Sequence, residues 1–211
     1  LIKIFSKNII ESHYSISIKS ILGSEVNFKG IAIIEFISTE NFGFTFPAVT
    51  AFYSSNSNYS AVHTAGRIKN PEEKKIPGEI IETNWNCKWD NGITPFFTLF
   101  NGSLKSEKSL INIKLLNANN NLIASKELDL NLSEPYSNKF IFLDEIFNFK
   151  NYKFDKNTFI EVKIPYSDFF PRMICGNFFR KEQFLEVTHS FENQKDNEDY
   201  LDEVQESYKN Y

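Results

Sequence analysis

The chain has 211 residues, of which 41% are hydrophobic and 24% charged, and this composition is typical of a globular protein with its own core. The mean hydropathy is −0.35, and no apolar run reaches the roughly eighteen residues that a membrane-spanning helix needs, so no membrane span is expected. The net charge is −4, and the three arginines (Arg67, Arg172 and Arg180) leave no strongly basic stripe. Nucleic acid is therefore not an expected partner, because such binding depends on neutralised phosphates.

Four residue types dominate the composition, with 22 Phe, 24 Ile, 24 Asn and 20 Lys. This bias is typical of proteins encoded by an AT-rich genome, whose codons favour these residues. The abundance of Asn and Lys is therefore no evidence for a function.

Alternation of apolar and polar residues predicts β-strands along most of the chain, beginning with Tyr14–Ile18. Two segments, Ile31–Ile37 and Phe96–Phe100, are apolar at successive positions, as in central strands that are covered on both faces. Further strands are predicted at Phe44–Tyr53, Ser60–Ile68, Glu79–Trp85, Ile111–Leu115, Leu122–Leu130, Lys139–Leu143, Ile160–Ile164, Arg172–Phe178 and Phe184–Phe191.

Turn-forming residues separate these strands, and the clearest hairpin has two arms around Asn117–Asn121. No long helix pattern lies between strands, so parallel crossovers are not expected and the neighbours should be antiparallel. The sequence therefore predicts a mostly β fold, an antiparallel two-sheet β-sandwich or jelly roll with a short acidic C-terminal tail. Residues 1–190 would form this domain, either as one body or as two halves that meet near residue 101.

The last segment, residues 191–211, differs in kind because it carries seven acidic and two basic residues. The composition favours a disordered extension. The alternative is a short docking helix, since Leu201, Val204 and Tyr208 have the spacing of one helical stripe.

Two cysteines, Cys87 and Cys175, are far apart in sequence and belong to no CxxC pair. This spacing argues against a zinc ribbon or a dithiol redox centre. The sequence leaves two interpretations, a pair of buried free thiols or one long-range disulfide.

Two of the three histidines are candidates for a functional site. His189 should point into the fold if Leu185 and Val187 do, because alternate residues share a face of a strand. The simpler interpretation makes His63 and His189 core or rim residues whose nitrogens are satisfied by backbone or hydroxyl groups. The sharper hypothesis joins them with Arg67 and Arg172 in one polar cluster that binds an anionic or polyhydroxyl ligand.

Bound metal is not expected, because no HxH pair occurs and the remaining facial set would be His63, His189 and a carboxylate such as Glu82. Phosphate-binding glycine loops and a GxSxG turn are also missing from the sequence. No cofactor is therefore expected.

The two tryptophans, Trp85 and Trp89, are interleaved with Asn84, Asn86, Lys88 and Asp90. Aromatic faces beside amide and carboxylate groups suit a sugar ring, which needs stacking on one side and hydrogen bonds at its edge. The alternative is that one or both tryptophans fill the core. The turn that begins at Asp90 favours Trp85 in the core and Trp89, with Asp90, at a ligand-binding rim.

The leading functional hypothesis is a non-catalytic module that binds a glycan or a partner protein as part of a longer polypeptide. One alternative is an enzyme domain in which His63, Arg67, Arg172 and His189 line a cleft for a polar or anionic small substrate. Another is a structural subunit of a surface or capsid assembly, for which a Phe-rich sandwich with an acidic arm is equally suitable.

Overall fold

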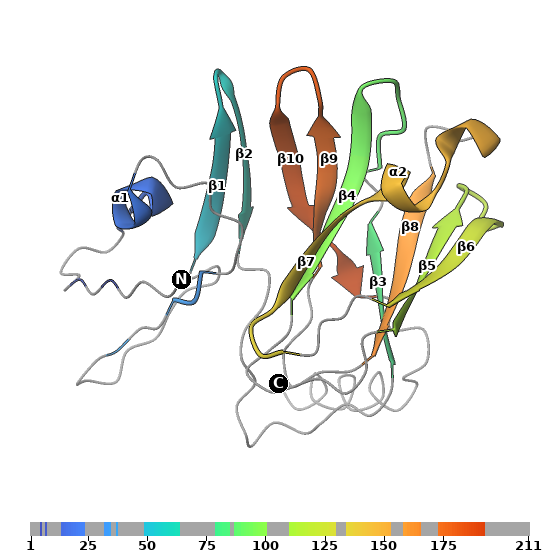
Figure 1. Cartoon of the computed structure of the whole chain (residues 1–211), viewed down its shortest axis with the longest axis horizontal. Coiled ribbons are helices and arrows are strands. Elements are labelled where there is room, and N and C mark those ends of the chain that lie inside the picture. The colour runs from blue at the N-terminus through green and yellow to red at the C-terminus, as the bar shows by residue number, and fades with distance from the viewer. Residues whose placement is uncertain are drawn as a thin grey trace, which may run out of the picture. The chain divides into compact units, whose positions relative to one another are not determined.

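The computed structural model in Figure 1 describes residues 5, 7, 14–23, 32–34, 37, 49–63, 79–84, 87–100, 110–129, 134–152, 158–165 and 173–192. The chain divides into two compact units, Leu1–Ala32 and Ile33–Tyr211. The predicted mostly β, antiparallel architecture is confirmed, and it lies in the second unit.

The first unit contains a short helix, α1 (Ile18–Leu22), where alternation predicted a strand over Tyr14–Ile18. This prediction was wrong. Residues 14–17 are exposed and in no strand, and the helix ends at Gly23, whose φ of +94° suits glycine. Alternation provides an apolar face, but a strand also needs a neighbour for its backbone hydrogen bonds.

The predicted central strand at Ile31–Ile37 was also wrong for its described residues. Ile33, Ile34 and Ile37 belong to no strand and are 58%, 54% and 85% exposed. A run of apolar residues cannot by itself show that other elements cover both faces.

The second unit contains eleven described strands in three antiparallel sheets. The hairpin sheet has the order β1-β2, the second sheet β10-β9-β4-β7 and the third β11-β3-β8-β5-β6. The strands are β1 (Thr50–Ser55), β2 (Asn58–His63), β3 (Glu79–Asn84), β4 (Ile93–Phe100), β5 (Leu110–Leu116), β6 (Leu122–Asp129), β7 (Asn138–Phe142), β8 (Phe159–Pro165), β9 (Ile174–Phe179), β10 (Phe184–His189) and β11 (Phe191–Glu192). Two short helical turns, α2 (Leu143–Ile146) and η1 (Phe149–Asn151), follow β7.

The four-stranded and five-stranded sheets face each other across one hydrophobic core, which makes the second unit a β-sandwich. The four-stranded sheet supplies buried Phe97, Ile141 and Cys175, and the five-stranded sheet supplies Ile113 and Val162. Each of these two sheets contains strands from before and after residue 101 in the sequence.

The other face of the four-stranded sheet carries a second apolar cluster. Alternation turns Phe96 and Val187 to this face, and Val62 of β2 packs on them. Phe140 stacks on Phe96 with ring centroids 4.6 Å apart. The β1-β2 hairpin is therefore held by a small core of its own.

The β5-β6 hairpin confirms the turn predicted at Asn117–Asn121. The Asn117 side chain accepts hydrogen bonds from the backbone N–H groups of Asn119 and Asn121, both at 3.0 Å. Asn120 has a φ of +64°, a conformation that Asn tolerates well.

After Glu192, the acidic segment lies outside the described residues, so its disorder or helical structure stays a prediction. Within the described ranges, no helix is long and apolar enough to cross a membrane.

Gly176 of β9 generates a first prediction. A Cβ atom placed there would lie 1.8 Å from the backbone oxygen of Glu186, so strands β9 and β10 would have to separate. We expect Gly176→Ala to lower the free energy of unfolding by about 3 kcal/mol or to prevent folding, as overpacking of a core does. Urea denaturation checks this.

Gly92→Ala is the matched control, because Gly92 also has positive φ (+89°) but no atom within 4 Å of its missing Cβ. It should cost only about 1 kcal/mol, the backbone penalty alone. Equal effects of the two substitutions would contradict the steric explanation.

Candidate functional site

The site begins where the β1-β2 hairpin meets the edge of β10. The Ser60 hydroxyl donates to the Leu185 carbonyl at 3.0 Å and accepts from the Val187 N–H at 3.1 Å. These two backbone groups belong to residues that lie opposite Phe178 and Gly176 of β9. The Ser60 side chain therefore satisfies backbone N–H and C=O groups at the edge of β10 that a neighbouring strand would otherwise bind.

This docking brings together the two histidines that the sequence singled out. The rings of His63 and His189 lie 4.4 Å apart between centroids, at 61° to each other. Both residues are half-buried, and His189 Nδ1 lies 2.7 Å from the Ser190 carbonyl oxygen. That hydrogen bond places a proton on Nδ1, since the carbonyl can only accept.

A buried carboxylate lies next in the chain of contacts. Glu82 of β3 is fully buried and accepts a hydrogen bond from the Ser190 hydroxyl. The same hydroxyl accepts from the Met173 N–H at 3.0 Å. Because the single Ser190 hydroxyl hydrogen goes to Glu82, this arrangement does not pair Ser190 as a nucleophile with His189 as its base.

The other residues predicted for the site are not brought to the histidine pair. Trp89 packs against the core between the two large sheets, whereas His189 lies on the opposite face of the four-stranded sheet. Trp89 donates its ring N–H to the Thr158 carbonyl at 3.4 Å and meets Phe149 edge-on at 4.7 Å. Arg67, Arg172 and Trp85 lie outside the described residues, as does Asn86.

Asp90 forms a turn. Its carboxylate accepts from the Asn91 N–H at 2.6 Å and its carbonyl from the Ile93 N–H at 3.1 Å. Gly92 supplies the positive φ that this turn into β4 needs. These bonds give Asp90 a local structural role.

The outer face of the hairpin holds two aromatic side chains that the sequence analysis did not single out. Phe52 of β1 is 74% exposed and Tyr59 of β2 is 79% exposed. The register pairs Phe52 with Ala61 and Ser54 with Tyr59, so the two rings project to one side from adjacent rungs of the hairpin. From Asn41 to Gly66 the chain has no Asp, Glu, Lys or Arg. This uncharged stretch is the sequence feature that could have drawn attention to the hairpin surface.

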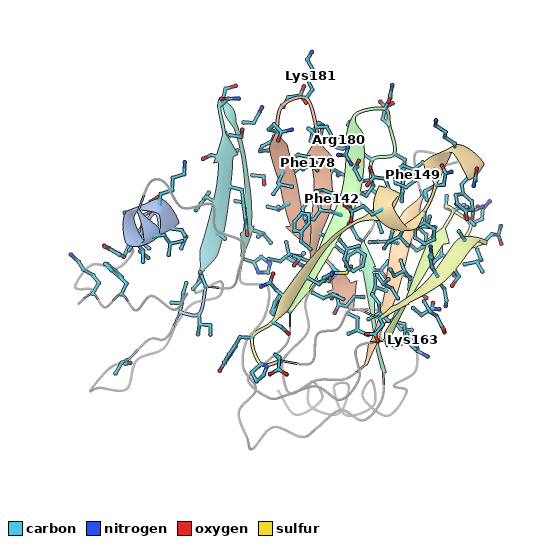
Figure 2. All side chains as sticks on the ribbon, viewed as in Figure 1. Phe142, Phe149, Lys163, Phe178, Arg180 and Lys181 are labelled. Carbon is cyan, nitrogen blue, oxygen red and sulfur yellow. The ribbon has the colours of Figure 1, made fainter. Side chains whose placement is uncertain are left out.

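Two polar networks link the four-stranded sheet to the segments beside it. Lys88 bonds to Glu186 at 2.7 Å, and buried Asn177 joins the Glu186 carboxylate to the Lys88 backbone N–H. Arg180 pairs with Asp144 and lies over the rings of Phe142 and Phe178 at 5.6 and 5.9 Å, in the region labelled in Figure 2. The charge of each cation is thus already balanced by a carboxylate.

Both cysteines are buried free thiols, which resolves the alternative that the sequence left open. Burial raises the pKa of Cys87 to about 12. Burial also raises the pKa of Cys175 well above its usual value, and the nearby charges of Cys87 and Glu82 add to this. Neither thiol is therefore activated as a nucleophile. Within the described part of the chain, no group of three or more His, Cys, Asp and Glu residues is arranged to hold a metal ion.

Comparison with protein-family models, curated proteins and solved structures finds no match to this chain.

The buried thiols predict how stability depends on pH. Because the pKa of Cys87 is raised on folding from 9.0 to about 12, its contribution is complete below about pH 9 and is lost as the pH rises toward 12. Urea denaturation should show a steeper fall in unfolding free energy above about pH 9 for the wild type than for the Cys87→Ala/Cys175→Ala variant. Parallel pH curves for the two proteins would contradict this.

The packing of Trp89 predicts the result of its truncation. Trp89→Ala should lower the free energy of unfolding by about 3 kcal/mol, because the ring leaves a gap at the core and Phe149 loses its neighbour. Trp89→Phe, which keeps an aromatic ring, should cost markedly less. A loss within about 1 kcal/mol for Trp89→Ala would place this side chain at a rim instead.

Proposed function

We propose that this chain is a non-catalytic β-sandwich module that binds a neutral glycan on the outer face of the β1-β2 hairpin. The observation that carries the proposal is the pair Phe52 and Tyr59, 74% and 79% exposed on one face of the hairpin. Large exposed aromatic side chains that share a face are typical of a binding surface.

The chemistry of this face suits a sugar. Its aromatic rings offer flat apolar surfaces for the C–H faces of a pyranose ring, and the phenol of Tyr59 adds a hydrogen-bonding group. Ser54 lies directly opposite Tyr59, and Thr50 lies on the same face one rung beyond Phe52. Successive rungs are about 7 Å apart along a strand, so aromatic and hydroxyl groups alternate over a short distance.

The absence of charge in the hairpin favours a neutral ligand over an anionic one. From Val49 to His63 the sequence contains no Asp, Glu, Lys or Arg. An acidic polysaccharide or a phosphorylated ligand would call for Lys or Arg on this surface.

The opposite face of the hairpin holds the surface in place. Val62 is buried against Phe96 and Val187, and Tyr53 packs at the margin of the same cluster. Burial raises the pKa of Tyr53, which agrees with its position on the packed side. The rings of Phe52 and Tyr59 are thus presented by an anchored hairpin, which lowers the entropy that binding would cost.

The test is binding to a panel of neutral polysaccharides and to a glycan array, measured by pull-down and by calorimetry. Phe52→Ser and Tyr59→Ser should each weaken binding by about tenfold or more, as the loss of an aromatic anchor does, while unfolding free energy stays within about 1 kcal/mol. Tyr136→Ser is the matched control, since Tyr136 is also an exposed tyrosine but lies before β7.

Two results would overturn the proposal. One is a folded wild-type protein that binds no neutral glycan on the panel. The other is glycan binding that the double variant Phe52→Ser/Tyr59→Ser retains in full. Binding of a protein ligand at the same face would instead favour a protein-recognition module.

A second candidate function rests on the contact between His63 and His189. It is an enzyme domain in which the two imidazoles, with Arg67 and Arg172, act on a polar or anionic small substrate. Turnover of phosphate-ester or carboxylate-ester test substrates that disappears in both His63→Gln and His189→Gln, with the fold intact by circular dichroism, would support it. Activity that survives both substitutions would exclude these histidines as catalytic groups.

A further inference from the structure

Three of the sheet edges among the described strands carry features that prevent pairing with another strand. The edge of β10 is occupied by the Ser60 hydroxyl. Strand β7 has five residues and includes Lys139, and β6 carries Lys126 and Glu127. Short strands and charged side chains are the usual means by which proteins avoid association through edges.

The outer edge of β1 differs from these. Among the described strands β1 pairs only with β2, and all six of its residues, Thr50–Ser55, pair in continuous register without a bulge. Its sequence, TAFYSS, contains no charged residue and no proline. This edge thus lacks the charged side chains of β6 and β7 and the hydroxyl contact that occupies the edge of β10.

The hairpin turn determines which backbone groups face outward from β1. Ser55 pairs with Asn58 across a two-residue turn at Asn56 and Ser57, and Asn56 has a φ of +53°. Such a turn is closed by a hydrogen-bonded pair, and bonded and non-bonded pairs then alternate along an antiparallel ladder. The N–H and C=O groups of Thr50, Phe52 and Ser54 are therefore directed away from β2.

We propose that β1 is a pairing edge at which a second copy of this chain adds its own β1, antiparallel, to join the two hairpins into one sheet. This inference does not rest on the proposed glycan function. In the symmetric register Phe52 of one copy lies opposite Phe52 of the other, and Thr50 lies opposite Ser54 on each side. The same outward backbone groups are supplied by both copies, as a two-fold interface requires.

The composition of β1 favours a second copy as the occupant. Self-pairing of a charged strand would place like charges opposite each other, which is destabilising, but β1 brings no charge to the dyad. The pairing also places two exposed Phe52 rings together and removes part of their surface from water. Association would thus cover both the open edge and part of the exposed Phe52 ring beside it.

The experiment is sedimentation velocity of the full chain over a wide range of protein concentration, without any ligand. We expect a monomer–dimer equilibrium. Ser54→Lys should weaken dimerisation by about tenfold or more because it places a cation from each copy at the pairing edge. Ser57→Lys, with the same charge change in the turn beyond the paired residues, should leave dimerisation unchanged.

A second variant separates loss of pairing from loss of folding. Ser54→Pro removes an outward N–H without removing a hydrogen bond to β2, so the hairpin should persist while the dimer is lost. Hydrogen exchange of the Thr50, Phe52 and Ser54 amides should slow as wild-type concentration rises.

Two outcomes would overturn the proposal. One is a wild type that stays monomeric at every concentration. If its Thr50, Phe52 and Ser54 amides are nevertheless protected at every concentration, another part of the same chain covers the edge. The other is a dimer that both Ser54 variants leave unchanged. Neither outcome bears on glycan binding, which Tyr59→Ser tests without touching the pairing edge, whereas Phe52 belongs to both proposals.

Discussion

The bond pair made by the Ser60 hydroxyl is the contact on which the candidate site depends. By accepting from one backbone group of β10 and donating to another, this hydroxyl fixes β2 beside the four-stranded sheet. The docked hairpin buries Val62, brings His63 to His189 and leaves Phe52 and Tyr59 on the solvent side. A hairpin alone is only marginally stable in water, so this bond pair and the packing of Val62 together hold its outer face in place.

Two fully buried polar residues inside the sandwich, Glu82 and Asn177, are held by hydrogen bonds. Glu82 and Asn177 are both fully buried, and burial of a carboxylate or an amide is costly unless hydrogen bonds replace those lost from water. Ser190 donates to Glu82, while Asn177 bonds to Lys88 and Glu186. These groups give the core directional contacts, and such contacts specify how the sheets align more narrowly than apolar packing does.

Much of the β architecture followed from alternation, whereas the candidate surface did not. Strands such as β5 and β8 were predicted because their apolar residues recur with period two and their turns are marked by Asn, Gly or Pro. The N-terminal segment at Tyr14–Ile18 has the same period but lacks a described neighbour, which no local pattern can show. The contact between His63 and His189 was one of two hypotheses, which rested on the strand parity of His189 and on the small numbers of His and Arg, since no local pattern shows that two distant strands meet. Phe52 and Tyr59 were not singled out, since alternation divides a strand into two faces without showing which one meets solvent.

The order of strands within the two large sheets has a consequence for how the chain reaches its native state. Strand β4 pairs with β7 and β9, and β3 pairs with β8 and β11. Neither large sheet can therefore be completed until strands from late in the sequence are available. Only local pairs such as β5 with β6, β9 with β10 and β1 with β2 can form early. Because distant pairing carries a large loop-closure cost, folding is expected on the millisecond-to-second scale, about that of other all-β domains. During synthesis on the ribosome, β3 and β4 emerge long before β8 and β9, and in that interval their apolar surfaces are open to aggregation.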